Sequence, residues 1–156
     1  MYADYEENFG LLNHAMLIYD RACRELSEPK DRFECLNLHL AKASEFYGAS
    51  RTRQLFERSF ELLQGSSPAD LIHMALRFAK MERKLGEVDR ARAIYQHASQ
   101  FCNPRVRANE HAFWAIWEKF EIYHGNEDTY ADYMRTKRTV ELRFSVAMPL
   151  TNLTNE

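Results

Sequence analysis

The apolar residues between positions 71 and 101 fall into two stripes of helical period, separated by Gly86. The first stripe consists of Leu71, Met74, Ala75, Phe78 and Leu85, and the second of Ala91, Ile94, Tyr95, Ala98 and Phe101. Residues three and four positions apart lie on one face of an α-helix, so each stripe predicts a helix with one buried face. Glycine accepts the left-handed conformation in which many helices end. Because the loop at Gly86 is short, the two helices should form an antiparallel hairpin.

The hairpin pattern recurs along the chain. Glycines at Gly10, Gly48, Gly86 and Gly125 are separated by steps of 38, 38 and 39 residues. An aromatic residue and a glutamate precede the glycine as Tyr2 with Glu6, Phe78 with Glu82, and Trp117 with Glu121, whereas the second unit has Ala41 with Glu45 and is one residue short. An aromatic and a small residue follow it as Tyr19 with Ala22, Phe56 with Ser59, and Tyr95 with Ala98, which Met134 and Lys137 replace in the fourth unit. This spacing indicates a structural repeat.

A single hairpin of this length cannot bury its own apolar stripe, so neighbouring units must supply the core to each other. The sequence therefore predicts an all-α fold, an elongated, right-handed α-solenoid of about four antiparallel helix hairpins. We expect helices near 11–26, 32–47, 52–63, 69–85, 88–102, 109–124 and 127–144, after a short one near 2–9. The repeat domain should span residues 1–145, with a frayed tail over 146–156. The first unit is incomplete, which predicts a fragment of a longer protein.

Composition agrees with a helical, soluble chain. Of the 156 residues 46% are apolar, 28% are charged and 13% are aromatic, and 5 glycines and 4 prolines leave few breaks. The net charge of −2 provides no global field for nucleic acid or an anionic membrane. Three cysteines without a close pair in the sequence argue against both a disulfide framework and a zinc site. With no secretory signal and no membrane-length apolar run, we expect an intracellular protein.

No set of residues predicts catalysis, a cofactor or a metal. The six histidines show neither i, i+3 nor i, i+4 pairing, and Cys102 has no nucleophile motif around it. Glu82 and Glu121 are predicted to be structural partners of adjacent helices. Arg53 and Arg92 recur by motif and are predicted to form structural ion pairs with the preceding glutamate.

The last helix is the best candidate for partner binding because it departs from the repeat. Its basic residues Arg135, Lys137, Arg138 and Arg143 predict that residues 130–145 dock an acidic protein surface. Arg51 and Arg90 form a second candidate edge. Four aromatic side chains could stack bases but are better explained as core: Phe113, Trp114, Trp117 and Phe120. Direct RNA binding stays open as the alternative, although no repeated polar code for bases is present.

The repeat motif resembles the HAT, or half-a-TPR, repeat. Ala91-Arg92-Ala93-Ile94-Tyr95 matches its second helix, and Trp114, Trp117, Glu121 and Gly125 match its first. The stretches LRFAKMERKLGEVDRARAIYQHASQFCNPR and FWAIWEKFEIYHGNEDT are similar to the carboxy-terminal repeats of the Syf/crooked-neck splicing factors of the XPA-binding-protein type. The resemblance covers roughly residues 1–145. It assigns structural repeat positions to Tyr19, Phe56, Glu82, Gly86, Arg92, Tyr95, Trp114, Trp117, Glu121 and Gly125.

The resemblance also implies a function. Proteins of this family are nuclear, non-enzymatic scaffolds of the spliceosome, within the nineteen-complex and intron-binding assemblies, with a second role in transcription-coupled repair. The implied partners are other spliceosomal proteins, with indirect or weak RNA contact and with neither a membrane nor a small-molecule substrate. HAT repeats also occur in ribosomal RNA processing and mRNA 3′-end formation, so a direct RNA-binding repeat protein is the alternative.

Overall fold

The computed structural model describes residues 3, 6, 10–105 and 109–146, and every regular element within them is an α-helix. The helices are α2 (Leu12–Glu25), α3 (Pro29–Phe46), α4 (Ala49–Leu62), α5 (Pro68–Lys84), α6 (Val88–Ser99), α7 (Asn109–His124) and α8 (Glu127–Val146). The all-α prediction is confirmed, and the predicted boundaries agree within about three residues. The predicted helix near 2–9 and the predicted tail over 146–156 lie outside the described residues, except for Ala3, Glu6 and Val146.

Two helices begin at proline, where the missing backbone N–H costs no intrahelical hydrogen bond. Pro29 starts α3 and Pro68 starts α5. The hydroxyl of Ser67 accepts a hydrogen bond from the Ala69 amide at 3.2 Å, as a helix cap does. α5 therefore begins one residue earlier than predicted, and α3 begins three residues earlier.

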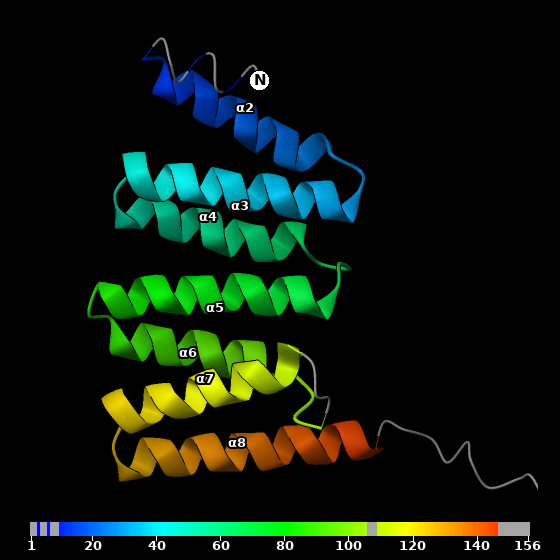
Figure 1. Ribbon diagram of the computed structural model, residues 1–156, viewed down its shortest axis with the longest axis vertical. Helices are drawn as coiled ribbons and strands as arrows, with labels where there is room; N and C mark the ends of the chain where they lie inside the picture. The colour runs from blue at the N-terminus through cyan, green and yellow to red at the C-terminus, as the bar shows by residue number, and fades with distance from the viewer. Residues whose placement is uncertain (1–2, 4–5, 7–9, 106–108, 147–156) are drawn as a thin grey trace, which may run out of the picture. The chain divides into compact units, whose positions relative to one another are not determined.

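The chain divides into two compact units at a boundary inside α5, Met1–Met74 and Ala75–Glu156. In the first unit, α2 packs against α3 and α3 against α4 (Figure 1). In the second unit, α6, α7 and α8 pack against one another. Within each unit, consecutive helices run antiparallel, as the hairpin pattern predicts. The elongated, right-handed stacking of the whole chain stays a prediction.

The core of the first unit joins aliphatic, aromatic and small side chains. Ala15, Met16 and Tyr19 of α2 are buried and pack with Ile18 and Tyr47. Further buried side chains come from α3 and α4: Leu36, Leu40, Ala43, Thr52, Phe56 and Ser59. The buried hydroxyl of Ser59 donates to the Leu55 carbonyl at 2.6 Å, so this polar group is satisfied within its own helix.

The core of the second unit is an aromatic cluster. Its rings are Tyr95 of α6, Phe113, Trp114, Trp117 and Phe120 of α7, and Tyr133 of α8, with neighbouring centroids 5.0–6.1 Å apart. Two of their polar atoms are hydrogen-bonded inside the unit: the Trp114 indole donates to the Cys102 carbonyl at 3.2 Å, and the Tyr133 hydroxyl donates to the Trp114 carbonyl at 3.3 Å. The interpretation of these rings as core, rather than as base-stacking surface, is confirmed by their burial.

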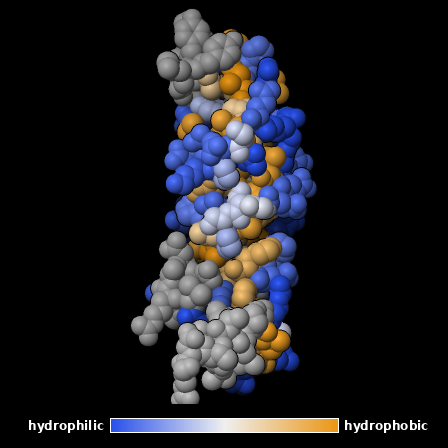
Figure 2. All heavy atoms as spheres, turned by 90° about the vertical axis from the view of Figure 1, so that its right-hand side faces the viewer, coloured by the Kyte–Doolittle hydropathy of each residue, from blue (hydrophilic) through white to orange (hydrophobic). Residues whose placement is uncertain are grey.

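Two apolar residues that were expected in buried stripes are exposed. Leu85 is 48% exposed and Phe101 is 40% exposed, because each lies just beyond the end of its helix. On the face shown in Figure 2, hydrophobic residues are visible between hydrophilic residues.

The four repeated glycines do not share one conformation. Gly86 has φ +80, and the next amide, of Glu87, donates to the Glu82 carbonyl at 3.0 Å, so this glycine ends its helix in the predicted left-handed conformation. Gly48 has φ −69 and is the N-cap of α4, whereas one further residue separates Gly10, Gly86 and Gly125 from the next helix. The second unit is therefore one residue shorter after its glycine, in addition to the residue that is missing between Glu45 and Gly48.

Gly125 is required by close packing rather than by its backbone angle. Asn126 and Thr129 cap α8 reciprocally, each side chain accepting from the other residue's amide at 2.9 Å. A Cβ on Gly125 would lie 2.6 Å from the Glu121 carbonyl oxygen and 2.6 Å from its Oε2, and in contact with the Thr129 hydroxyl. A methyl group at this position therefore displaces both the helix cap and a buried carboxylate.

We expect Gly125→Ala to lower the free energy of unfolding by about 1–3 kcal/mol through this overpacking. Gly48→Ala is the matched control, because a Cβ at Gly48 meets no atom within 4 Å. It should cost less than about 1 kcal/mol, the loss of an N-cap glycine. Urea unfolding followed by circular dichroism measures both, and equal costs would contradict the packing explanation.

Trp117 is only 1% exposed, so we expect Trp117→Ala to cost about 3–5 kcal/mol. The control is Ile122→Ala on the same helix, where the side chain is 62% exposed and the cost should stay within about 0.5 kcal/mol. Both values come from urea unfolding curves. A Trp117→Ala protein that unfolds like the parent would place the indole outside the core and favour the base-stacking interpretation.

Candidate docking surfaces

The buried carboxylate of Glu121 ties α6 to α7. It accepts hydrogen bonds from Arg92 Nε at 2.9 Å and 3.2 Å and from the Trp117 indole at 3.1 Å. Its side chain is 0% exposed and that of Arg92 is 15% exposed. The predicted structural role is therefore observed, but Arg92 pairs with the glutamate of the following unit, whereas the sequence interpretation paired it with the preceding one. These charges hold helices together and do not form a docking surface.

The structure separates the four basic residues predicted on α8. Arg135, Arg138 and Arg143 are exposed, and Arg135 pairs with Asp132 one turn earlier. Lys137 instead lies over Tyr133, with its ammonium 5.7 Å from the ring centroid and 3.4 Å from the hydroxyl. Lys137 therefore belongs to the packing of α8 on the aromatic cluster, because its ammonium lies over the Tyr133 ring.

A groove of about 420 Å³ lies between α6 and α8. Its lining consists of Gln96, Ser99, Gln100, Arg135, Thr136, Thr139, Val140 and Arg143. The hydroxyls of Ser99, Thr136 and Thr139 donate to carbonyls of their own helices and keep their lone pairs as acceptors. The groove thus brings together Arg135 and Arg143, and it contains no carboxylate in its lining. We call it the α6–α8 groove.

The charge at the edge of this groove is not set by the repeat. The eighth residue of the second helix of each unit is Tyr19, Phe56, Tyr95 and Met134, and the first three are buried. The ninth residue is Asp20, Glu57, Gln96 and Arg135. The eighth position therefore holds an aromatic residue or methionine in every unit. The ninth position instead changes from an acidic residue in the first two units to glutamine in the third and arginine in the fourth. Arg135 consequently has no role that the packing of the repeat requires.

The second predicted edge, Arg51 with Arg90, is divided between the two units. Arg90 lies on α6 and forms an ion pair with Glu87 at 3.7 Å. Arg51 lies on α4, and its guanidinium stacks 4.7 Å from the centroid of the Tyr47 ring. A continuous edge formed by both arginines stays a prediction, but Arg51 lines a groove within its own unit.

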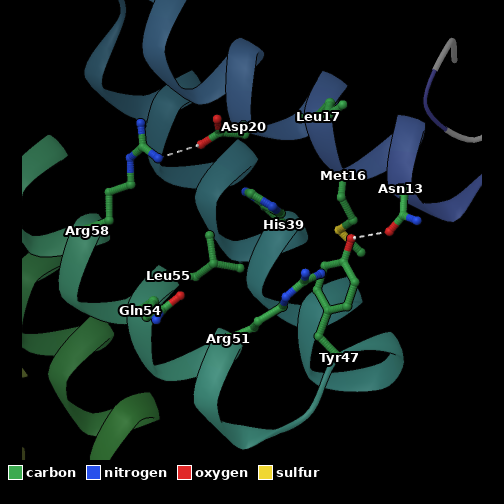
Figure 3. A pocket seen from close by; sticks show the side chains of 10 residues that line it. All are labelled: Asn13, Met16, Leu17, Asp20, His39, Tyr47, Arg51, Gln54, Leu55 and Arg58. Atoms are coloured by element: carbon green, nitrogen blue, oxygen red, sulfur yellow. Dashed lines mark hydrogen bonds and ion pairs between the residues drawn. The ribbon is translucent and has the colours of Figure 1, made fainter.

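This α2–α4 groove has a volume of about 390 Å³. Its lining consists of Asn13, Met16, Leu17 and Asp20 of α2, His39 of α3, Tyr47 at the end of α3, and Arg51, Gln54, Leu55 and Arg58 of α4. Figure 3 shows Asn13, Tyr47 and Arg51 gathered at one end, Asp20 and Arg58 at the other, and His39 and Leu55 between them. The Tyr47 hydroxyl donates to Asn13 Oδ1 at 3.1 Å, and Arg58 pairs with Asp20 at 3.3 Å.

His39 forms a neutral floor of the α2–α4 groove. Its side chain is buried and its ring stacks on Tyr19 with centroids 5.9 Å apart. Burial, and to a lesser degree the nearby charge of Arg58, lowers the pKa of His39 to about 4. At neutral pH the imidazole is therefore uncharged, and it adds no positive charge to the groove.

The lowered pKa of His39 makes stability depend on pH. In the unfolded chain the pKa is about 6.5, so between pH 6.5 and 4 the unfolded state binds more protons than the folded state. The contribution of neutral His39 is complete above about pH 6.5 and is lost as the pH falls towards about 4. We expect urea unfolding at about pH 7 and about pH 4.5 to show a smaller pH-dependent loss in His39→Gln than in the parent. Equal losses in the two proteins would contradict the lowered pKa of His39.

Two cysteines that are far apart in the sequence meet in the first unit. Cys23 of α2 and Cys35 of α3 bring their sulfur atoms to 3.1 Å as free thiols. Burial, followed by the hydrogen bond with Cys35, raises the pKa of the Cys23 thiol. The sequence interpretation missed this pair, although twelve residues on two antiparallel helices can place two side chains opposite each other. Cys102 is buried and its thiol donates to the Ala98 carbonyl at 3.2 Å, in agreement with an inert thiol.

Within the described ranges, no three histidine, cysteine, aspartate or glutamate side chains are grouped in a way that could hold a metal ion. Of the helices described, none is both long enough and apolar enough to cross a membrane.

Comparison with known proteins gives one consistent result. Residues 1–155 match the family described as "Pre-mRNA-splicing factor Syf1/CRNKL1 C-terminal HAT repeat". Similar relatives are the pre-mRNA-splicing factor syf1 of Aspergillus fumigatus (47% identical), its homolog in Drosophila melanogaster (46%) and the pre-mRNA-splicing factor SYF1 of Homo sapiens (43%). Each similarity covers 93% of this chain, whereas the chain spans only 16% of the length of each of these relatives.

Proposed function

This chain belongs to the Syf1/CRNKL1 carboxy-terminal HAT-repeat family, and from that membership we propose that it serves in pre-mRNA splicing as a non-enzymatic protein-interaction scaffold. Its relatives are named as splicing factors, and a nuclear location follows from that role. Stacked helix hairpins suit a scaffold because each unit adds exposed surface while its core stays closed. The buried Glu121 and Arg92 are engaged in holding helices, which fits a structural use of the charged repeat residues.

We assign the partner contact to the α6–α8 groove and the adjoining exposed face of α8. The observation that carries this proposal is the placement of Arg135 and Arg143 along one groove whose lining has no carboxylate. Guanidinium groups bind carboxylates with paired hydrogen bonds, so the surface favours an acidic protein segment. The glutamine and threonine side chains beside the arginines supply neutral donors and acceptors for the same segment.

Direct RNA binding is the second candidate, because the same arginines and amides could also contact phosphate. The aromatic residues of α7 do not support it, since Trp114 and Trp117 are buried and cannot stack on bases. The role in transcription-coupled repair that the resemblance implies stays a prediction, because no contact of the described residues bears on it.

The test is capture of spliceosomal proteins from nuclear extract by the tagged chain, with and without ribonuclease. We expect the double substitution Arg135→Glu and Arg143→Glu to reduce the capture about tenfold or more, because it places carboxylates against an acidic partner. Arg138→Glu should weaken it less, since Arg138 is exposed on α8 but does not line the groove. The melting temperature should stay within about 2 °C in each case, because exposed ion pairs contribute little to stability.

Arg21→Glu is the matched control, because Arg21 is exposed on α2 and pairs with Glu25 within its own helix at 2.8 Å. It should leave the capture unchanged. Capture that survives ribonuclease and fails in the double variant supports protein docking at α8. Capture that ribonuclease abolishes would favour the RNA-binding alternative, and unchanged capture in the double variant would move the contact to another surface.

A further inference from the structure

The α2–α4 groove combines an apolar middle with charged ends. Leu17 is 65% exposed on one wall, and the half-buried Leu55 lies on the other, above the neutral His39. When a second apolar group covers the solvent-exposed apolar surface of a concave site, the free energy falls. The middle of the groove therefore suits one aliphatic side chain of a ligand.

The two ends of the groove differ in whether the arginine that lines them has a carboxylate partner. At one end Arg58 has a carboxylate partner, Asp20, which also pairs with Arg24. At the other end Arg51 stacks on Tyr47, and no carboxylate of the described residues forms an ion pair with it. The stacking holds the guanidinium at the rim without satisfying its donors. This end consequently offers an oriented cation for an incoming carboxylate.

The amides beside Arg51 provide further hydrogen-bonding capacity. Asn13 accepts from the Tyr47 hydroxyl through Oδ1, which leaves its NH₂ group as a donor at the groove. Gln54 is exposed on the opposite helix and presents both a donor and an acceptor. Such groups match the carbonyls and amides of an extended backbone, which a small anion does not possess.

We propose that the α2–α4 groove binds a short extended peptide segment that carries an acidic residue two positions from an aliphatic residue. The carboxylate binds Arg51, and the aliphatic side chain lies between Leu17 and Leu55. This surface lies in the other unit from the α6–α8 groove, and the proposal depends neither on that groove nor on a splicing role.

The spacing follows from helix and strand geometry. Arg51 and Leu55 are four residues apart on α4, which corresponds to about 6 Å along the helix axis. In an extended chain, side chains two residues apart point to the same side and are separated by about 6.7 Å. From Asn13 to Asp20 the groove extends about 10 Å, the length of about three extended residues. Adjacent acidic and aliphatic residues would point to opposite sides and could not use both sites.

The test is a titration of the whole chain with a synthetic capped peptide, Gly-Ser-Glu-Ser-Leu-Ser-Gly, followed by amide NMR. We expect saturable shifts at α2 and α4 amides with a dissociation constant of about 1 mM or tighter, as a contact of this small size allows. A peptide with Gln in place of Glu should bind about tenfold more weakly, because the charged hydrogen bonds to Arg51 are lost. A peptide with Glu and Leu adjacent should be similarly weak, because only one of its side chains can reach the groove.

Two substitutions on the protein separate the two contacts. Arg51→Gln should remove the preference for Glu over Gln, and its control is Arg90→Gln on α6. Leu17→Gln should weaken binding about threefold or more through lost apolar contact. Its control is Leu142→Gln on α8, because both leucines are 65% exposed and neither change opens the core.

Each other outcome overturns the proposal. Absence of shifts at peptide concentrations of about 5 mM excludes the ligand class, and equal binding of the Glu and Gln peptides excludes the role of Arg51. Shifts confined to α6 and α8 amides would place acidic peptides in the α6–α8 groove alone, in support of the proposed function but against this one. Binding of a single-stranded oligouridine at α2 and α4, without binding of the peptide, would assign the groove to nucleic acid.

Discussion

The packing of α6, α7 and α8 depends on one buried charge, the carboxylate of Glu121. A carboxylate that is removed from water destabilises the fold unless its oxygens are hydrogen-bonded, and a buried ion pair contributes only when its geometry satisfies both partners. Arg92 and the Trp117 indole meet this condition from two helices. The same carboxylate lies close enough to Gly125 to exclude a side chain there, so the choice of glycine, the cap of α8 and the ion pair are parts of one arrangement.

Grooves form between the second helices of successive units, outside the closed core. The chemistry of each groove is set by the surface residues that line it. The α2–α4 groove pairs Asp20 with Arg58, whereas Arg51 stacks on Tyr47 and forms no ion pair with a carboxylate of the described residues. The α6–α8 groove has Gln96 and Arg135 at its edge and no carboxylate in its lining. Because exposed charges contribute little to folding, such positions can differ between units without a cost in stability. Partner choice can therefore vary along the chain while the repeat stays intact.

The helices and the aromatic core could be predicted from the sequence because both follow from a helical period of apolar residues. The period could not identify the partner of Arg92, since a repeat places an arginine between two equivalent glutamates and only three-dimensional packing selects one. The pattern also treated four glycines as equivalent. Gly86, however, adopts a positive φ, whereas Gly125 lies where a side chain would not fit. Lys137 looked like part of a basic surface, but its position over Tyr133 depends on a contact between side chains that charge patterning does not contain.

The candidate surfaces were only partly predictable for a related physical reason. The sequence singled out Arg135 and Arg143 because α8 departs from the repeat, but the groove that joins them also needs Gln96 and Gln100 from α6, which carry no signal of their own. Arg51 was identified as an exposed cation, whereas its orientation by Tyr47 and the balance of Arg58 by Asp20 required the structure. Buried residues repeat because they must fill the same space, and surface residues are free of that constraint. In such a protein, the residues that determine binding are therefore the ones that the repeat pattern predicts least well.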